Sequence, residues 1–414
     1  MIQIPKDLRY FFSGSIYSGL SSLIGLLAPL IVLPHIINTI GLTYYGISAV
    51  AFTVSIFLSL VVDFGFNISC VNKLSKTKEN KSAIISNVIY AKALIFLLLI
   101  VLAIISYLIL FDSKIEQKVY LTSLIIPLTS VFNMSWALQG LQRIKAWSIF
   151  QSIGFIIYVV ATFLLINSPD DVLFVNLAYG IGFLSSGFFS LIYLTTSHKV
   201  FLSRLKIRAV LEEIRDSYHF FLSNVLSYAT LFFLGPLTGA IISYEAAGIY
   251  SILEKIYQLM RKPLSIYQTL MLPKISGILE FDRFRALSLI RKTYPFVVFL
   301  ILIQSVVIFF YKEEVIIFFT LDNVELLNRL LSISFAGILM VMANSPIVLL
   351  LMALDKKRTL MYFSLSGFVL GVILAVPLIK TYGVLGTVYT LLFIESYFAI
   401  SFVFVVRKKM DTIK

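Results

Sequence analysis

Long apolar stretches recur along this chain, and they constrain its fold more than any other feature. The twelve runs cover about residues 15–37, 43–64, 84–110, 119–140, 147–166, 172–195, 218–242, 247–272, 294–311, 330–354, 360–380 and 383–406. Each is close to the length with which a helix crosses a membrane, because about 20 helical residues span the roughly 30 Å of a bilayer core. Hydrocarbon offers no partners for free backbone N–H and C=O groups, so each run is predicted to be a transmembrane α-helix.

Composition excludes most other classes of protein. Hydrophobic residues make up 59% of the 414 residues, which would leave a soluble domain without a polar surface. The first run lacks a small-residue cleavage site and continues into a series of similar runs, so we expect a span and not a removable signal peptide. The single cysteine, Cys70, excludes an internal disulfide and a cysteine-based metal cluster.

Catalytic motifs are missing from the sequence. It contains no Gly-x-x-x-x-Gly-Lys-Ser/Thr phosphate loop, and no metal or Ser/His/Asp constellation is visible. We therefore expect neither an enzyme nor a bound metal or organic cofactor.

Lys and Arg residues are distributed unequally between the predicted loops, and this fixes the orientation. If the amino terminus is cytoplasmic, most of the 34 basic residues fall in cytoplasmic segments. The opposite loops hold only Lys114, Lys118, Lys312, Arg329 and Lys380. This is the positive-inside pattern, so both termini are predicted to be cytoplasmic. The net charge of +13 follows from this pattern together with attraction to anionic lipid, and it does not indicate nucleic-acid binding.

Short matches at a near-constant offset divide the chain into two halves. Pro34 and the later Gly46-Ile47 correspond to Pro236 and Gly248-Ile249. Each half contains six predicted spans, so the halves should run in the same sense through the membrane. We predict two pseudo-symmetric six-helix bundles, residues 1–205 and 206–414. The basic linker, residues 197–217, has the imperfect periodicity of a surface-lying amphipathic helix.

One predicted span is unusually polar. The stretch 248–274 carries Glu254, Lys255, Arg261 and Lys262. At 3.6 residues per turn, Glu254, Gln258 and Arg261 share one face, and the two lysines lie on its flank. A charge at mid-bilayer costs about 2.5 to 17 kcal/mol, so the stripe must face water or protein. It is predicted to line the pathway of a transporter.

Further charges fall within other predicted spans. Glu395 lies midway through the last run, where it either faces a cavity, pairs with a cation of another helix or is neutral in a packed interface. Asp63 is deep if its helix continues to Lys73 and interfacial if the helix breaks at Gly65. Lys92 either contributes to a cavity or extends its stem to the interface.

Pro263 follows Arg261 and Lys262 directly. A proline inside a helix removes a backbone donor, so this residue is predicted to kink or interrupt the helix. Interrupted helices at membrane depth are tolerated where they line a cavity.

Several motifs in order resemble a known family. They are IINTIGLTYYGISAVAF, VVDFGFNISCVNKLS, WALQGLQRIKAW, and GIYSILEKI with the later LPKIS. Over essentially the whole chain they resemble Wzx-type O-antigen and polysaccharide repeat-unit flippases of the multidrug/oligosaccharidyl-lipid/polysaccharide (MOP) exporter superfamily. The cations Arg261 and Lys262 match the family's habit in the eighth span, and Asp63 matches its DFG-like run. The resemblance assigns no counterpart to Glu395 and Lys92.

The resemblance implies a fold and a function. The fold is a MATE/MurJ-like pair of six-helix bundles around a central cationic cavity. The function is alternating-access transfer of an undecaprenyl-pyrophosphate-linked oligosaccharide, an O-antigen or capsule repeat unit, from the cytoplasmic to the periplasmic leaflet of the bacterial inner membrane. A polysaccharide polymerase and a chain-length regulator would be protein partners.

Candidate site residues follow from charge. The cations Arg261, Lys262, Lys255 and Lys92 are expected to bind the pyrophosphate, because fixed cations replace its hydration. The carboxylates Glu254, Asp63 and Glu395 are candidates for a coupling H⁺ or Na⁺, or for a switch. A cation-coupled multidrug exporter of the same superfamily is the alternative, although it should show net acidic cavity residues. A lipid-linked-sugar polymerase or ligase would need larger outer loops.

Overall fold

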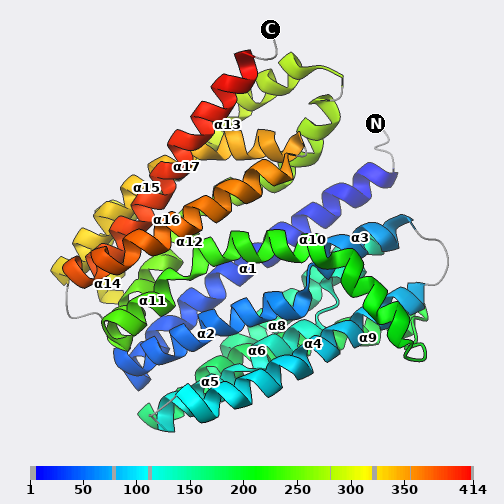
Figure 1. Ribbon diagram of the computed structural model, residues 1–414, viewed down its shortest axis with the longest axis horizontal. Coiled ribbons are helices and arrows are strands. Elements are labelled where there is room, and N and C mark those ends of the chain that lie inside the picture. Colours follow the sequence, from blue (N-terminus) through cyan, green and yellow to red (C-terminus); the bar gives the residue numbers. More distant parts are fainter. Residues whose placement is uncertain are drawn as a thin grey trace. The chain divides into compact units, whose positions relative to one another are not determined.

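The computed structural model describes residues 6–76, 81–110, 114–279, 281–318, 324–354 and 356–411, and these contain helices but no strand. The elements are α1 (Lys6–Ile40), α2 (Leu42–Asp63), α3 (Phe66–Lys76), α4 (Lys81–Leu110), α5 (Lys114–Ser123), α6 (Ile125–Phe132), α7 (Ser135–Gly140), α8 (Ile144–Leu165), the 3₁₀ helix η1 (Pro169–Leu173), α9 (Phe174–His198), α10 (Ile207–Phe232), α11 (Leu234–Ile241), α12 (Tyr244–Leu279), α13 (Arg283–Phe310), α14 (Lys312–Phe318), α15 (Val324–Ala353), α16 (Lys357–Tyr382) and α17 (Val384–Asp411). Figure 1 traces them from the blue α1 to the red α17.

The helices form two compact units. Unit 1 is Met1–Tyr228 and unit 2 is Ala229–Lys414. The division falls inside α10, whose first half packs on unit 1 through the buried Val210. The predicted bundle boundary, between residues 205 and 206, precedes this helix and stays a prediction.

The predicted membrane spans are largely present as helices. Among the described residues, ten helical segments are long and apolar enough to cross a membrane. The predicted runs 218–242 and 247–272 are not among them. Charged residues continue along α10 as far as Asp216, and that helix ends at Phe232. The run 247–272 lies on α12, where the charged stripe lowers the hydropathy. The all-α membrane fold is therefore confirmed, and the number of twelve spans stays a prediction.

In unit 1 a sharp break separates α2 from α3. The backbone passes through left-handed conformations at Phe64 (φ 45°) and Gly65 (φ 79°). A Cβ on Gly65 would lie 2.7 Å from the backbone N of Phe221 in α10, so only glycine fits there. The Phe64 ring stacks on the ring of Phe221, with centroids 4.3 Å apart. Of the two alternatives for Asp63, the helix that ends near Gly65 is the observed one.

Another predicted span of unit 1 is interrupted. The run 119–140 consists of α5, α6 and α7, which are separated at Leu124 and at Asn133–Met134. The last of these helices carries Trp136, which is buried with Leu138 and Phe66 in the main core of unit 1. The interruption therefore places a large aromatic side chain in the core beside α4.

In unit 2 the long helix α12 packs against α13, α15 and α17. It remains a continuous helix through Pro263, so of the two predicted outcomes the interruption is wrong and the kink stays a prediction. Proline removes the hydrogen bond to the carbonyl four residues earlier, which here belongs to Leu259. Gln304 of α13 replaces that bond, because its side-chain Nε2 donates to the Leu259 oxygen at 3.2 Å. A neighbouring helix thus satisfies the group that proline would leave unpaired.

Candidate functional site

A partly buried ion pair links two helices of unit 2. The Arg261 Nη1 of α12 donates to the Glu395 Oε1 of α17 at 2.9 Å. The Glu395 side chain is only 6% exposed, whereas the Arg261 side chain is 32% exposed. Glu395 therefore pairs with a cation of another helix, one of the alternatives that the sequence left open. The guanidinium keeps donors on its accessible side, since one of its five N–H groups makes this bond.

Aromatic and amide side chains support the pair. The Tyr257 hydroxyl, one turn before Arg261, donates to Glu395 Oε1 at 3.4 Å. The Arg261 guanidinium carbon also lies 5.5 Å from the centroid of the Tyr257 ring, within cation–π range. From α15, Asn344 Nδ2 donates to the backbone oxygen of Glu395 at 3.3 Å. These contacts hold the carboxylate and the guanidinium in one geometry.

The polar stripe of α12 is organised by hydrogen bonds along the helix. Lys255 Nζ donates to Ser251 Oγ at 2.9 Å, and Gln258 Nε2 donates to Glu254 Oε1 at 3.1 Å. Glu254 thus pairs with Gln258 and makes no ion pair with Arg261 in the described structure. Lys262 is half-buried, and no described residue forms a hydrogen bond or ion pair with its ammonium group.

The stripe is longer than the charged residues alone suggested. Ser265, Gln268 and Thr269 continue it at the same spacing, and Ser265 and Thr269 are exposed. Gln268 Nε2 donates to Ser345 Oγ of α15 at 3.1 Å. From Ser251 to Thr269 the polar positions fall within roughly 140° of the helix circumference and extend about 27 Å, nearly the roughly 30 Å of a bilayer core. The same periodicity in the sequence would have revealed these three residues.

Unit 1 contains a second buried ion pair. Lys92 Nζ of α4 donates to Asp63 Oδ1 at the end of α2 at 2.7 Å. The Lys92 side chain is 0% exposed, and its ammonium group lies 5.8 Å from the centroid of the Trp136 ring. The Trp136 Nε1 is buried and finds no hydrogen-bond partner within the described ranges. Lys92 therefore does not present its charge to an open surface.

A third polar cluster joins α3 to α10 next to the break at Gly65. Lys73 Nζ donates to Glu213 Oε1 at 2.5 Å, and Ser69 and Ser217 share a hydrogen bond of 2.7 Å. Burial lowers the pKa of Lys73, but the hydrogen bond and charge of Glu213 outweigh it, and the net pKa lies above its usual value. Burial also raises the pKa of the Cys70 thiol to about 11, so this thiol stays protonated at neutral pH. Glu213 did not stand out in the sequence, because nothing there indicated its partner.

The predicted site residues thus fall into two groups. Arg261, Lys262, Lys255 and Glu254 lie on α12, and Glu395 joins them from α17. Asp63 and Lys92 form a separate pair in unit 1. No group of three or more His, Cys, Asp or Glu residues that could hold a metal ion occurs in the described part of the chain.

Comparisons with known proteins add an independent observation. Residues 11–278 match the family described as polysaccharide biosynthesis protein. The chain is also 22% identical, over 382 residues, to a Shigella dysenteriae protein named as an O-antigen transporter; the match covers 89% of this chain and 93% of that protein. These findings confirm the resemblance that the motifs indicated.

Solved structures share the fold. An inward-facing multidrug resistance MATE family transporter of the MOP superfamily gives a TM-score of 0.71 at 14% identity, covering 93% of this chain and 95% of that one. The lipid II flippase MurJ in an inward closed conformation gives a TM-score of 0.70 at 19% identity, covering 96% and 87%. The predicted MATE/MurJ-like fold is therefore confirmed. All three proteins are named as transporters or flippases, in agreement with a protein that is not an enzyme.

Proposed function

Because the chain belongs to the polysaccharide biosynthesis protein family, we propose that it is a flippase for an undecaprenyl-pyrophosphate-linked oligosaccharide, an O-antigen or capsule repeat unit. It moves this lipid across the bacterial inner membrane by alternating access, with both termini in the cytoplasm. The observation that carries the proposal is the cationic polar stripe of α12, centred on the partly exposed Arg261. The name of the Shigella dysenteriae relative, an O-antigen transporter, supports the substrate class.

The chemistry of the stripe suits a pyrophosphate. This group is polyanionic, and a charge at mid-bilayer costs about 2.5 to 17 kcal/mol. Arg261 offers N–H donors that Glu395 does not use, and Lys262 and Lys255 flank it on the same helix. Charge-assisted hydrogen bonds from these groups would replace the hydration of the phosphates. The hydroxyl and amide groups farther along the stripe would accompany the sugars, while the polyprenyl tail remains in lipid.

Glu395 gives the site a way to release its cargo. The carboxylate and a bound pyrophosphate compete for the same guanidinium, so Glu395 stabilises Arg261 when no substrate is bound. Binding of H⁺ or Na⁺ to Glu395, Glu254 or Asp63 would bias the conformational equilibrium. A carrier without such coupling or product removal only equilibrates its substrate.

The experiment that tests this function removes the pair as a unit. Arg261→Ala alone would leave the buried Glu395 charge unpaired, which confuses loss of transport with loss of folding. We therefore use Arg261→Ala/Glu395→Gln in a strain that lacks the natural gene, and measure surface polysaccharide at matched protein levels. We expect a loss of at least about tenfold, which corresponds to about 1.4 kcal/mol.

A matched control pair exists in the same unit. Arg329 and Glu325 of α15 form an exposed ion pair at 2.7 Å. Arg329→Ala/Glu325→Gln should leave surface polysaccharide near the wild-type amount. Normal polysaccharide with Arg261→Ala/Glu395→Gln, at wild-type expression, would refute the assigned role.

The multidrug exporter is the second candidate, and the shared fold with a MATE family transporter favours it. Such a carrier for organic cations would present acidic groups, whereas the α12 stripe carries three cations and one anion, Glu254. Drug susceptibility of a deletion strain separates the two functions. Increased susceptibility with an unchanged surface polysaccharide would favour the exporter.

A further inference from the structure

The connection between α9 and α10 has an unusual composition. Residues 199–206 form neither helix nor strand, and we call residues 199–211 the linker strap. It contains no acidic residue. Its basic residues, all exposed, are Lys199, Arg204, Lys206 and Arg208.

The strap is fixed to unit 1 at three points. Val200 and Val210 are 8% and 3% exposed and belong to the main core of the unit. Between them, the Ser203 N–H donates to Ser86 Oγ at 2.8 Å, and the Ser203 carbonyl accepts from the Tyr90 hydroxyl at 2.8 Å. The backbone of the strap is therefore held in place by α4.

Large apolar side chains nevertheless point outward from this anchored backbone. The exposed fractions are 64% for Phe201, 63% for Leu202, 57% for Leu205, 68% for Ile207 and 54% for Leu211. They alternate along the chain with the exposed cations. Since the backbone is anchored, the exposure belongs to the folded unit and calls for a partner that is both apolar and anionic.

The anchors place the strap at one end of a membrane span. Ser86 and Tyr90 belong to the first turns of α4, whose candidate span begins at Lys81. At 1.5 Å per residue, Ser86 lies about 7.5 Å along the helix from Lys81. Interfacial amphipathic segments bury their apolar side chains about 5–10 Å into the boundary between headgroups and acyl chains. The strap therefore lies beside the first turns of this candidate span and has the composition of a segment at the membrane surface.

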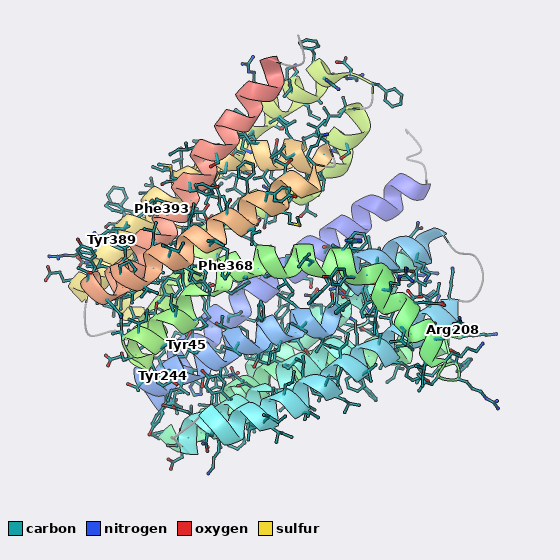
Figure 2. All side chains as sticks on the ribbon, in the orientation of Figure 1. Tyr45, Arg208, Tyr244, Phe368, Tyr389 and Phe393 are labelled. Atoms are coloured by element: carbon teal, nitrogen blue, oxygen red, sulfur yellow. The ribbon has the colours of Figure 1, made fainter. Side chains whose placement is uncertain are left out.

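We propose that the linker strap is a docking surface for anionic phospholipid headgroups. Arg204, Lys206 and Arg208 contact the phosphates, and Phe201 and Leu202 enter the acyl region. Figure 2 shows Arg208 at the start of α10. Within residues 199–211 the cations have no acidic neighbour and are interleaved with apolar side chains, although the exposed Glu212 follows directly. This pattern suits an anionic leaflet better than a protein surface, where the cations would need acidic partners. The inference does not depend on the transported substrate.

The test compares two triple variants of the full-length protein. Arg204→Gln/Lys206→Gln/Arg208→Gln removes three strap charges, and Lys118→Gln/Lys312→Gln/Lys380→Gln removes three charges from the loops predicted to lie on the other side. Each protein is purified in detergent and titrated with phosphatidylglycerol or with phosphatidylcholine, and the shift in its unfolding temperature is measured. We expect the strap variant to need at least about tenfold more phosphatidylglycerol for half of the wild-type shift. The reason is that each basic residue near an anionic membrane surface adds to the affinity for that surface, and the variant lacks three of them. The other variant should match the wild type.

An equal response of both triple variants would overturn the proposal, since the stabilisation by phosphatidylglycerol would then depend on the overall charge of the protein and not on the strap. A second readout follows the apolar side chains. Leu202→Cys in a Cys70→Ala background carries a spin label, whose accessibility to oxygen and to a water-soluble nickel chelate reports depth in nanodiscs. A label in bulk water would contradict lipid docking and favour a protein partner. A protein that is a dimer as wild type and a monomer as the strap variant would contradict lipid docking and favour a second copy of this chain.

Discussion

At the scale of single residues, the buried pair of Asp63 and Lys92 is the most demanding feature of unit 1. Both side chains are largely removed from water, with Lys92 0% and Asp63 11% exposed, and each is the other's ion-pair partner. Lys92→Met should therefore destabilise the protein by about 3–5 kcal/mol, because it leaves an unpaired buried carboxylate. Lys92→Met/Asp63→Asn should recover much of that loss. Chemical denaturation of the purified variants measures both effects, with the exposed Lys118→Met as the control.

The two variants together separate a charge effect from a packing effect. If the double variant is as unstable as Lys92→Met, altered packing at position 92 and not the loss of the ion pair explains the destabilisation. The sequence could not identify this pair, because 29 residues separate its members and their contact depends on how α2 and α4 pack. The sequence did show that both charges lie within or at the end of apolar runs, where a charge without water or a partner costs free energy.

At the scale of helices, α12 depends on a side chain from α13. Gln304→Leu should destabilise the protein by about 1–3 kcal/mol, because the Leu259 carbonyl then loses its donor inside the membrane. In a Pro263→Ala background the helix regains its own N–H donor, so the same substitution should cost less. Thermal unfolding of the four proteins gives this coupling energy. An equal cost of Gln304→Leu in both backgrounds would show that the bond does not compensate for Pro263.

Helices were easier to predict than their interruptions. The apolar runs predicted the helices because membrane burial of the backbone allows no other local structure. Pro263 was expected to kink or interrupt α12, and the interruption does not occur; the sequence could not show this, because the compensating Gln304 lies 45 residues away from Leu259. No glycine lies at the breaks at Leu124 and at Asn133–Met134, so the sequence did not indicate them. The continuous polar stripe, by contrast, could be predicted in full from spacing alone.

At the scale of the whole molecule, the orientation follows from the distribution of Lys and Arg. Both termini are predicted to be cytoplasmic, and the region around Lys312 is predicted to be periplasmic. A fluorescent protein fused after Lys414 should fluoresce, and alkaline phosphatase inserted after Lys312 should be active. A non-fluorescent fusion after Lys414 together with an inactive phosphatase after Lys312 would show that the topology is the reverse of the predicted one.

The two units carry different parts of the proposed mechanism. The α12 stripe and its partner Glu395 belong to unit 2, whereas the Asp63–Lys92 pair belongs to unit 1. The sequence predicted two halves from short matches, and contacts between helices group the chain into two units. Loop composition alone could not place the division inside α10, because that helix is continuous through it.

Thiol labelling measures directly whether the α12 stripe is accessible to water and contacts the transported lipid. Ser265→Cys in a Cys70→Ala background places one thiol on the stripe, and Phe299→Cys places one on the exposed apolar face of α13. Labelling with a membrane-impermeant thiol reagent is followed in proteoliposomes with and without the lipid-linked oligosaccharide. We predict that the thiol at position 265 is labelled, that the oligosaccharide lipid slows this labelling, and that the thiol at position 299 is not labelled. An unlabelled thiol at position 265, or labelling that the lipid leaves unchanged, would contradict the account.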